Sequence, residues 1–99
     1  MDKMSKAKAI VMNPADNTAT AVEAMGPDVD VIMSIGGEAV TVHVIDSISF
    51  GHKFAVRDIL KGDKIIKYGE TIGLATQNIR AGRHVHVHNL ESGRGRGDK

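Results

Sequence analysis

Apolar and polar residues alternate most clearly near the middle of the chain. Residues 39–45 read Ala-Val-Thr-Val-His-Val-Ile, so three valines share one side of an extended chain and Thr41 and His43 the other. Residues 29–35 form a second apolar stretch, and Gly36-Gly37 between the two stretches is typical of a two-residue hairpin loop. The pattern predicts a β-hairpin in this part of the chain.

Shorter apolar stretches lie before the hairpin. Residues 7–12 are apolar enough to open a sheet, and Asn13 and Pro14 then break the run. Asp16 or Asn17 can cap a short helix, which we expect over residues 18–25.

The second half of the chain contains an internal repeat with an offset of 20 residues. Residues 55–65 and 75–85 share Ala, Asp or Asn, Ile, Gly and Ile or Val at matching positions. Each copy predicts a short helical turn, a glycine turn that can adopt positive φ, and a strand. The two strands are expected over residues 64–67 and 84–88. Many short strands and glycine turns predict a mainly β fold with one or two short helices.

The composition narrows the class of protein. The 99 residues fit one domain, expected over residues 1–90, with a disordered tail over 91–99 that is rich in Gly, Ser and charge. Aromatic residues make up only 3%, so the core has to rest on Val, Ile, Ala and Met. Such a short domain is not expected to enclose a deep pocket, and a catalytic role predicts a partner that supplies much of the site.

Several classes of function lack support. The 13 Lys and Arg residues nearly balance 12 Asp and Glu, which argues against a nucleic-acid binder. The chain has no cysteine, which excludes disulfides and thiolate metal sites. No apolar run approaches the roughly 20 residues that span a bilayer, and residues 1–8 do not form a signal peptide, so a cytoplasmic protein is expected. Phosphate-loop, nucleophile-elbow and HExxH motifs are absent from the sequence.

The sharpest chemical feature is His84-Val85-His86-Val87-His88-Asn89. On a strand the three imidazoles share one face, and they can bind metal or act as acid or base. A straight strand would place His84 and His88 about 13 Å apart, so at most two neighbouring histidines of the three could share one ion with groups from elsewhere. The alternative is a solvated strand face. Asn89 is either a turn residue or a hydrogen-bond partner for a ligand hydroxyl.

The second feature is Gly51-His52-Lys53. The glycine permits close approach to the backbone, His52 is titratable, and Lys53 offers a positive charge to a carboxylate substrate. The alternative is a polar loop whose neighbour Phe54 anchors the core.

Four motifs, in the same order along the chain, carry a resemblance to a known family. They are Asn17-x-Ala19-x-Ala21, Gly51-His52-Lys53-Phe54-Ala55-x-x-Asp58-Ile59, Ile66-Lys67-Tyr68-Gly69-x-x-Ile72-Gly73 and His84-Val85-His86-x-His88-Asn89. Residues 7–90 resemble the N-terminal domain or small subunit of the altronate/galactarate dehydratase family. The resemblance implies a SAF-type domain with a β-clip fold. Because the chain ends soon after the His-Asn motif, it is expected to be the separate small-subunit form, inactive without a large catalytic subunit.

The resemblance also implies a reaction, the β-elimination of water from a hexonate or hexarate such as altronate or galactarate. It implies a divalent metal such as iron(II), held mainly by the large subunit, and a hydroxy-acid substrate. His52 and His86 are then the candidate catalytic residues, Lys53, His88 and Asn89 the candidate substrate-binding residues, and His86 with His88 the candidate metal ligands. Two alternatives stay open, a small subunit of (2R)-sulfolactate sulfo-lyase and a non-catalytic SAF module that binds a sugar acid or metal. A homo-oligomer is also compatible with the sequence.

Overall fold

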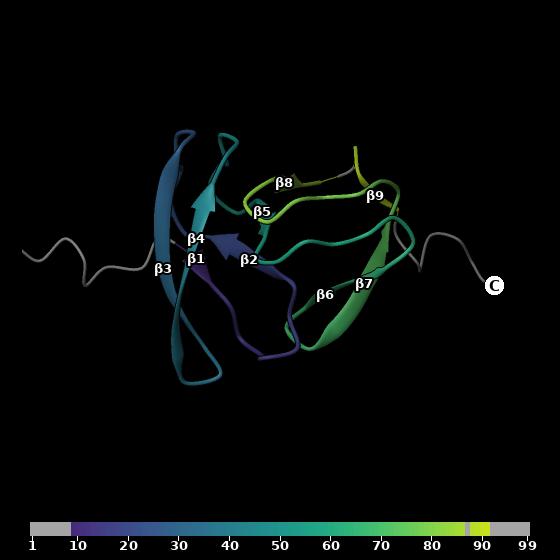
Figure 1. Cartoon of the computed structure of the whole chain (residues 1–99), viewed down its shortest axis with the longest axis horizontal. Helices are drawn as coiled ribbons and strands as arrows, with labels where there is room; N and C mark the ends of the chain where they lie inside the picture. Colours follow the sequence, from purple (N-terminus) through teal and green to yellow (C-terminus); the bar gives the residue numbers. More distant parts are fainter. Residues whose placement is uncertain (1–8, 87, 92–99) are drawn as a thin grey trace, which may run out of the picture.

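The chain folds into short antiparallel strands (Figure 1), seen in a computed structural model that describes residues 9–86 and 88–91. The strands are β1 (Ala9–Ile10), β2 (Thr18–Ala21), β3 (Val29–Ile35), β4 (Glu38–Val44), β5 (Lys53–Ala55), β6 (Lys64–Lys67), β7 (Glu70–Ala75), β8 (His84–Val85) and β9 (Leu90–Glu91). They form sheets in the orders β1-β2-β5-β8, β3-β4 and β6-β7-β9. The mainly β prediction is confirmed and is consistent with a β-clip fold.

The predicted hairpin is present. β3 and β4 pair in register from Val29 opposite Val44 to Ile35 opposite Glu38. Val42 and Val44 are buried, whereas Thr41 and His43 on the other face are exposed, as the alternation predicts. The buried face packs on β1, β2 and β5 to form the first core, which comprises Ala9, Ala19, Ala21, Met25, Val31, Met33, Val42, Val44, Ile48, Phe54 and Val56.

The predicted helix over residues 18–25 is wrong, and within the described residues no segment is helical. Thr18–Ala21 is instead strand β2, paired with both β1 and β5. Asp16, one of the two expected helix caps, does not cap a helix. Its buried carboxylate instead accepts hydrogen bonds from the N–H groups of Gly69 (2.7 Å) and Asn13 (3.2 Å). Burial against two neighbouring strands outweighs the local capping signal.

The repeat produces an approximate two-fold relationship. Its two copies cross in opposite directions between the sheets (Figure 1), and Ile59 and Ile79 exchange backbone hydrogen bonds of 2.8 and 2.7 Å at the crossing. The contacts are reciprocal: Asp58 Oδ1 accepts from the N–H of Ala81 at 2.9 Å, and Asn78 Oδ1 accepts from the N–H of Lys61 at 2.8 Å.

The predicted helical turns are therefore wrong, because these segments are held by side-chain caps from the other copy. The predicted strand over residues 64–67 is confirmed as β6. The second core lies between the copies and comprises Ala55, Ile59, Ile65, Ala75, Ile79 and Val85.

Across the described part of the chain, the structure contains no helix long and apolar enough to cross a membrane. Glu91, the first residue of the expected tail, pairs with Leu74 in β7. Residues 92–99 lie outside the described residues.

Candidate functional site

The histidine-rich segment is not the straight strand that its alternation predicts. β8 ends at Val85, and the chain turns back so that the N–H of Asn89 donates to the carbonyl of His86 at 3.0 Å. This turn brings the side chains of His84 and His88 close together, with their ring centroids 5.4 Å apart. The separation of about 13 Å expected for an extended chain is therefore wrong.

Asn89 explains the turn. Its side chain is 5% exposed. The amide nitrogen donates to the carbonyl of His84 at 2.8 Å, and the amide oxygen accepts from the N–H of His86 at 3.0 Å. Asn89 thus fills the place of a neighbouring strand and holds the backbone of both histidines.

His52 joins these histidines from another part of the chain. It directly precedes β5, which pairs with β8 so that Phe54 lies opposite His84. His52 Nδ1 lies 2.9 Å from His84 Nε2, so one ring donates an N–H and the other accepts it. The centroid of the His52 ring is 4.5 Å from that of His86.

We call His52, His84 and His86 the histidine cluster. One ligand atom of each lies within 4.8 Å of those of the other two, and all three side chains are partly exposed. The structure thus brings together the two predicted catalytic residues, His52 and His86, and adds His84. A metal ion is better matched by the histidine cluster than by the predicted pair, because His88 is not part of it.

Local electrostatics favour neutral imidazoles. Burial, followed by the proximity of His52 and of the other nearby histidines, lowers the pKa of His84 below its usual value. Burial, then His52 and Lys53, lowers the pKa of His86 in the same direction. A neutral imidazole keeps a lone pair that can accept a proton or bind a metal.

Asp46 holds the backbone of His84, one of the three histidines of the cluster. Its carboxylate accepts hydrogen bonds from the backbone N–H of His84 and from Arg83 Nη1, both at 2.9 Å. Burial acts to raise the pKa of Asp46, but these two hydrogen bonds outweigh it, and the pKa lies below its usual value. Asp46 therefore remains a carboxylate that fixes the start of β8.

Lys53 adds positive charge beside the cluster. Its side chain is partly buried, and burial, followed by repulsion from Lys67, lowers its pKa. The charge of Lys53 also contributes to the lowered pKa of His86, so the two groups interact. This is the geometry that a carboxylate-bearing ligand would complement.

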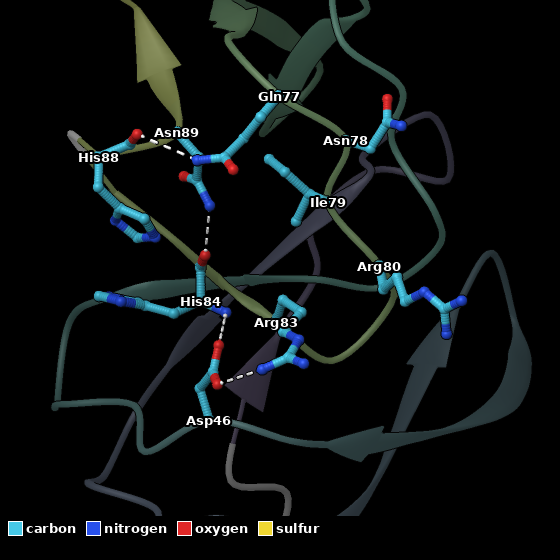
Figure 2. A pocket seen from close by; sticks show the side chains of 9 residues that line it. All are labelled: Asp46, Gln77, Asn78, Ile79, Arg80, Arg83, His84, His88 and Asn89. Carbon is cyan, nitrogen blue, oxygen red and sulfur yellow. Dashed lines mark hydrogen bonds and ion pairs between the residues drawn. The ribbon is translucent and has the colours of Figure 1, made fainter.

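A pocket of about 420 Å³ opens next to His84. Figure 2 shows His84 and His88 on one side of the pocket and Arg80 and Arg83 on the other. Its lining residues are Asp46, Gln77, Asn78, Ile79, Arg80, Arg83, His84, His88 and Asn89.

The sequence analysis missed Arg80, Arg83, Asp46 and the role of His84. The repeat carried a usable signal, because Arg80 and Arg83 replace Leu60 and Asp63 of the first copy. Asp46, which lies outside the repeat, gave no comparable signal.

The fold and the site together define a small β domain that presents histidines and basic side chains on an open face. Residues 7–93 match the model of the altronate/galactarate dehydratase SAF domain, and the chain belongs to this family.

Named relatives agree. Altronate dehydratase from Escherichia coli is 41% identical over 83 residues, which are 84% of this chain and 16% of that protein. (2R)-sulfolactate sulfo-lyase subunit alpha from Chromohalobacter salexigens is 49% identical over 51 residues, 52% of this chain and 54% of that subunit. Altronate dehydratase from Bacillus subtilis is 47% identical over 53 residues, 54% of this chain and 11% of that protein. The chain thus spans between about a tenth and about half of the length of these relatives.

Proposed function

We propose that this chain is the SAF component of a sugar-acid dehydratase and contributes one wall of an active site that removes water from a hexonate or hexarate by β-elimination. The observation that carries the proposal is the histidine cluster beside Lys53, on a domain that is 41% identical to altronate dehydratase over 84% of its length. An open face of this kind needs a second protein surface to exclude water.

The arrangement suits the chemistry of elimination. A proton next to the carboxylate has to be removed, negative charge develops on the resulting enediolate, and an acid has to assist the departing hydroxyl. His52 and His86 are placed to exchange protons with a substrate. Lys53 and His88 orient its carboxylate and hydroxyl groups, with Arg80 and Arg83 available in the adjoining pocket. Asn89 acts by holding the histidine backbone, because its amide already has two partners.

A larger protein supplies the opposite wall in this proposal. The relatives named as subunit alpha of a sulfo-lyase support an enzyme of several subunits. The divalent metal expected for the family would be held mainly by that larger protein, in the cytoplasm. A metal supplies a Lewis acid for the developing enediolate when bound.

The test is to express the chain with a large altronate dehydratase-type subunit and assay the complex with altronate and galactarate. His86→Ala should lower kcat/KM by about 10²–10⁴-fold, the usual contribution of a general acid or base, without a change in melting temperature.

His43→Ala is the matched control, since His43 is an exposed histidine on β4, and it should leave turnover unchanged. Unaltered activity of His86→Ala, or full turnover by the chain without its partner, would contradict the proposal.

The second candidate is the sulfo-lyase reaction. It is favoured by one observation, the 49% identity to a subunit alpha of which the chain covers 54%. Sulfite release from (2R)-sulfolactate by the same complex, without dehydration of altronate or galactarate, would select it. Binding of a sugar acid with no reaction of any of the three substrates would instead indicate a non-catalytic SAF module.

A further inference from the structure

We propose that His52, His84 and His86 form a binding site for one divalent transition-metal ion. The proposal deepens the proposed function, on the same face of the domain, but it concerns binding by this chain alone. It differs from the expected pair of His86 and His88, and it assigns to this chain an ion that the proposed function places mainly on the larger protein.

The spacing of the ring nitrogens carries the argument. One ligand atom from each histidine lies within 4.8 Å of the other two. Two nitrogens bound to one ion at about 2.1 Å and at right angles are about 3.0 Å apart, and His52 Nδ1 lies 2.9 Å from His84 Nε2. The rings are stacked, with angles of 12–25° between their planes, so metal binding requires them to turn until their lone pairs face a common point.

The supporting framework exists without an ion. β5 places His52 beside β8 by pairing Phe54 with His84. Asn89 holds the backbone of His84 and His86 through both ends of its amide. A site whose backbone is fixed by hydrogen bonds loses little conformational freedom when a metal binds.

The internal repeat supplies a comparison within the same molecule. Asn17 Nδ2 donates to the carbonyl of Lys64 and Asn17 Oδ1 accepts from the N–H of Ile66, both at 2.8 Å. Lys64 and Ile66 precede His84 and His86 by the repeat offset of 20, so Asn17 is the counterpart of Asn89. The same clamp serves both halves, and only the second half carries imidazoles. The histidines are therefore not required by the fold.

The donor set indicates which ions would bind. Three imidazoles suit Zn²⁺, Co²⁺, Ni²⁺ or Fe²⁺ and leave positions open for water, substrate or a partner's ligand. Partial exposure of all three side chains gives an ion access from solvent.

The experiment is a titration of the purified full chain with Co²⁺, followed by visible absorption and, in parallel, with Zn²⁺ by calorimetry. We expect saturable binding of one ion per chain. Loss of a residue that only supports a metal ligand typically weakens metal affinity by about 10–100-fold. His84→Gln and His52→Gln each remove a ligand itself, so each should weaken the affinity by more than that. Circular dichroism checks that both variants are folded.

His88→Gln and His43→Gln are the matched controls and should change the affinity less than about twofold, well below the tenfold effects of losing a supporting group. Absence of saturable binding would overturn the proposal, as would a loss with His88→Gln equal to that with His84→Gln. A complex that dehydrates substrate although the chain binds no metal would refute the site alone. A chain that binds metal in a complex without turnover would refute the proposed function alone.

Discussion

His43 shows how a single residue on the solvent side of a strand acquires a distinct chemistry. Its Nδ1 lies 2.7 Å from Asp30 Oδ1 and its Nε2 lies 3.3 Å from Asp28 Oδ1. The hydrogen bonds that the protonated ring donates to the carboxylates of Asp30 and then Asp28 raise the pKa of His43 above 6.5. The pKa of His43 is therefore shifted in the opposite direction to the pKa values of His84 and His86, which are lowered.

This difference is measurable by following the histidine ring signals with NMR as the pH changes. We expect the titration midpoint of His43 to lie above those of His84 and His86. Asp30→Asn should lower the midpoint of His43 more than Asp28→Asn, because Asp30 makes the shorter hydrogen bond. Equal midpoints for the three histidines would refute the assigned contacts.

Asn89 and Asn17 allow a second comparison at this scale. Each side chain is nearly buried and bonds two backbone groups two residues apart. Replacing either by Ala leaves those groups without partners, and we expect each variant to lose about 1–3 kcal/mol of unfolding free energy in urea titrations.

Only one of the two variants should affect the functional face. Asn89→Ala should also weaken Co²⁺ binding and turnover, whereas Asn17→Ala should leave both unchanged once the folded fraction is taken into account. If Asn17→Ala impairs metal binding as strongly as Asn89→Ala, the clamp of Asn89 has no specific role.

At the scale of elements, sequence patterns succeeded where their cause is local. The hairpin follows from alternation and Gly36-Gly37, and β6 follows from the repeat. The helix over residues 18–25 failed because β2 is stabilised by strands from elsewhere in the chain. Residues 84–88 failed as one strand because the buried amide of Asn89 replaces a strand neighbour. These bonds reach backbone groups only three and five residues away, but a single side chain that bonds the backbone leaves no periodic signal in the sequence.

The same limit applies to the candidate site. His52 and His86 were identified from their motifs, but their proximity depends on the pairing of β5 with β8. The histidine cluster could therefore not be predicted from the spacing of residues 84–88 alone.

The repeat also provides a matched pair of glycines. Gly62 and Gly82 both have φ of 91°. A Cβ on Gly62 meets no atom within 4 Å, whereas one on Gly82 collides with the carbonyl oxygen of His43. The Gly82 carbonyl also accepts a hydrogen bond from the N–H of Ile45 at 2.8 Å, so the second glycine turn is fastened to the end of β4.

We therefore expect different costs for the same substitution. Gly62→Ala should lose about 1–3 kcal/mol of unfolding free energy from backbone strain alone. Gly82→Ala should lose a further ~1–3 kcal/mol because backbone atoms have to move. Chemical denaturation of the two variants measures the difference, and equal losses would argue against the close approach of Gly82 to β4.

For the whole molecule, the two groups of histidines make stability depend on pH with opposite signs. His84 and His86 have folded pKa values below the unfolded value of 6.5, so the folded state binds fewer protons. Their effect on stability is favourable above that pH and is lost as the pH falls below it. His43 has a raised folded pKa, so its contribution is present below 6.5 and is lost as the pH rises through the folded value. The contribution of His43 is small because the pair with Asp30 is exposed.

The acid side should therefore dominate the pH profile. Melting temperatures measured with a chelator between about pH 5 and pH 8 should rise with pH through the region near 6.5. The double variant His84→Gln, His86→Gln should have a flatter profile on the acid side, because neither folded nor unfolded state then changes its protonation at these positions. His43→Gln should keep that acid-side loss and remove only the weak decline at higher pH. A double variant with the slope of the unmodified chain would mean that burial and mutual repulsion do not disfavour protonation of the histidine cluster in the folded protein.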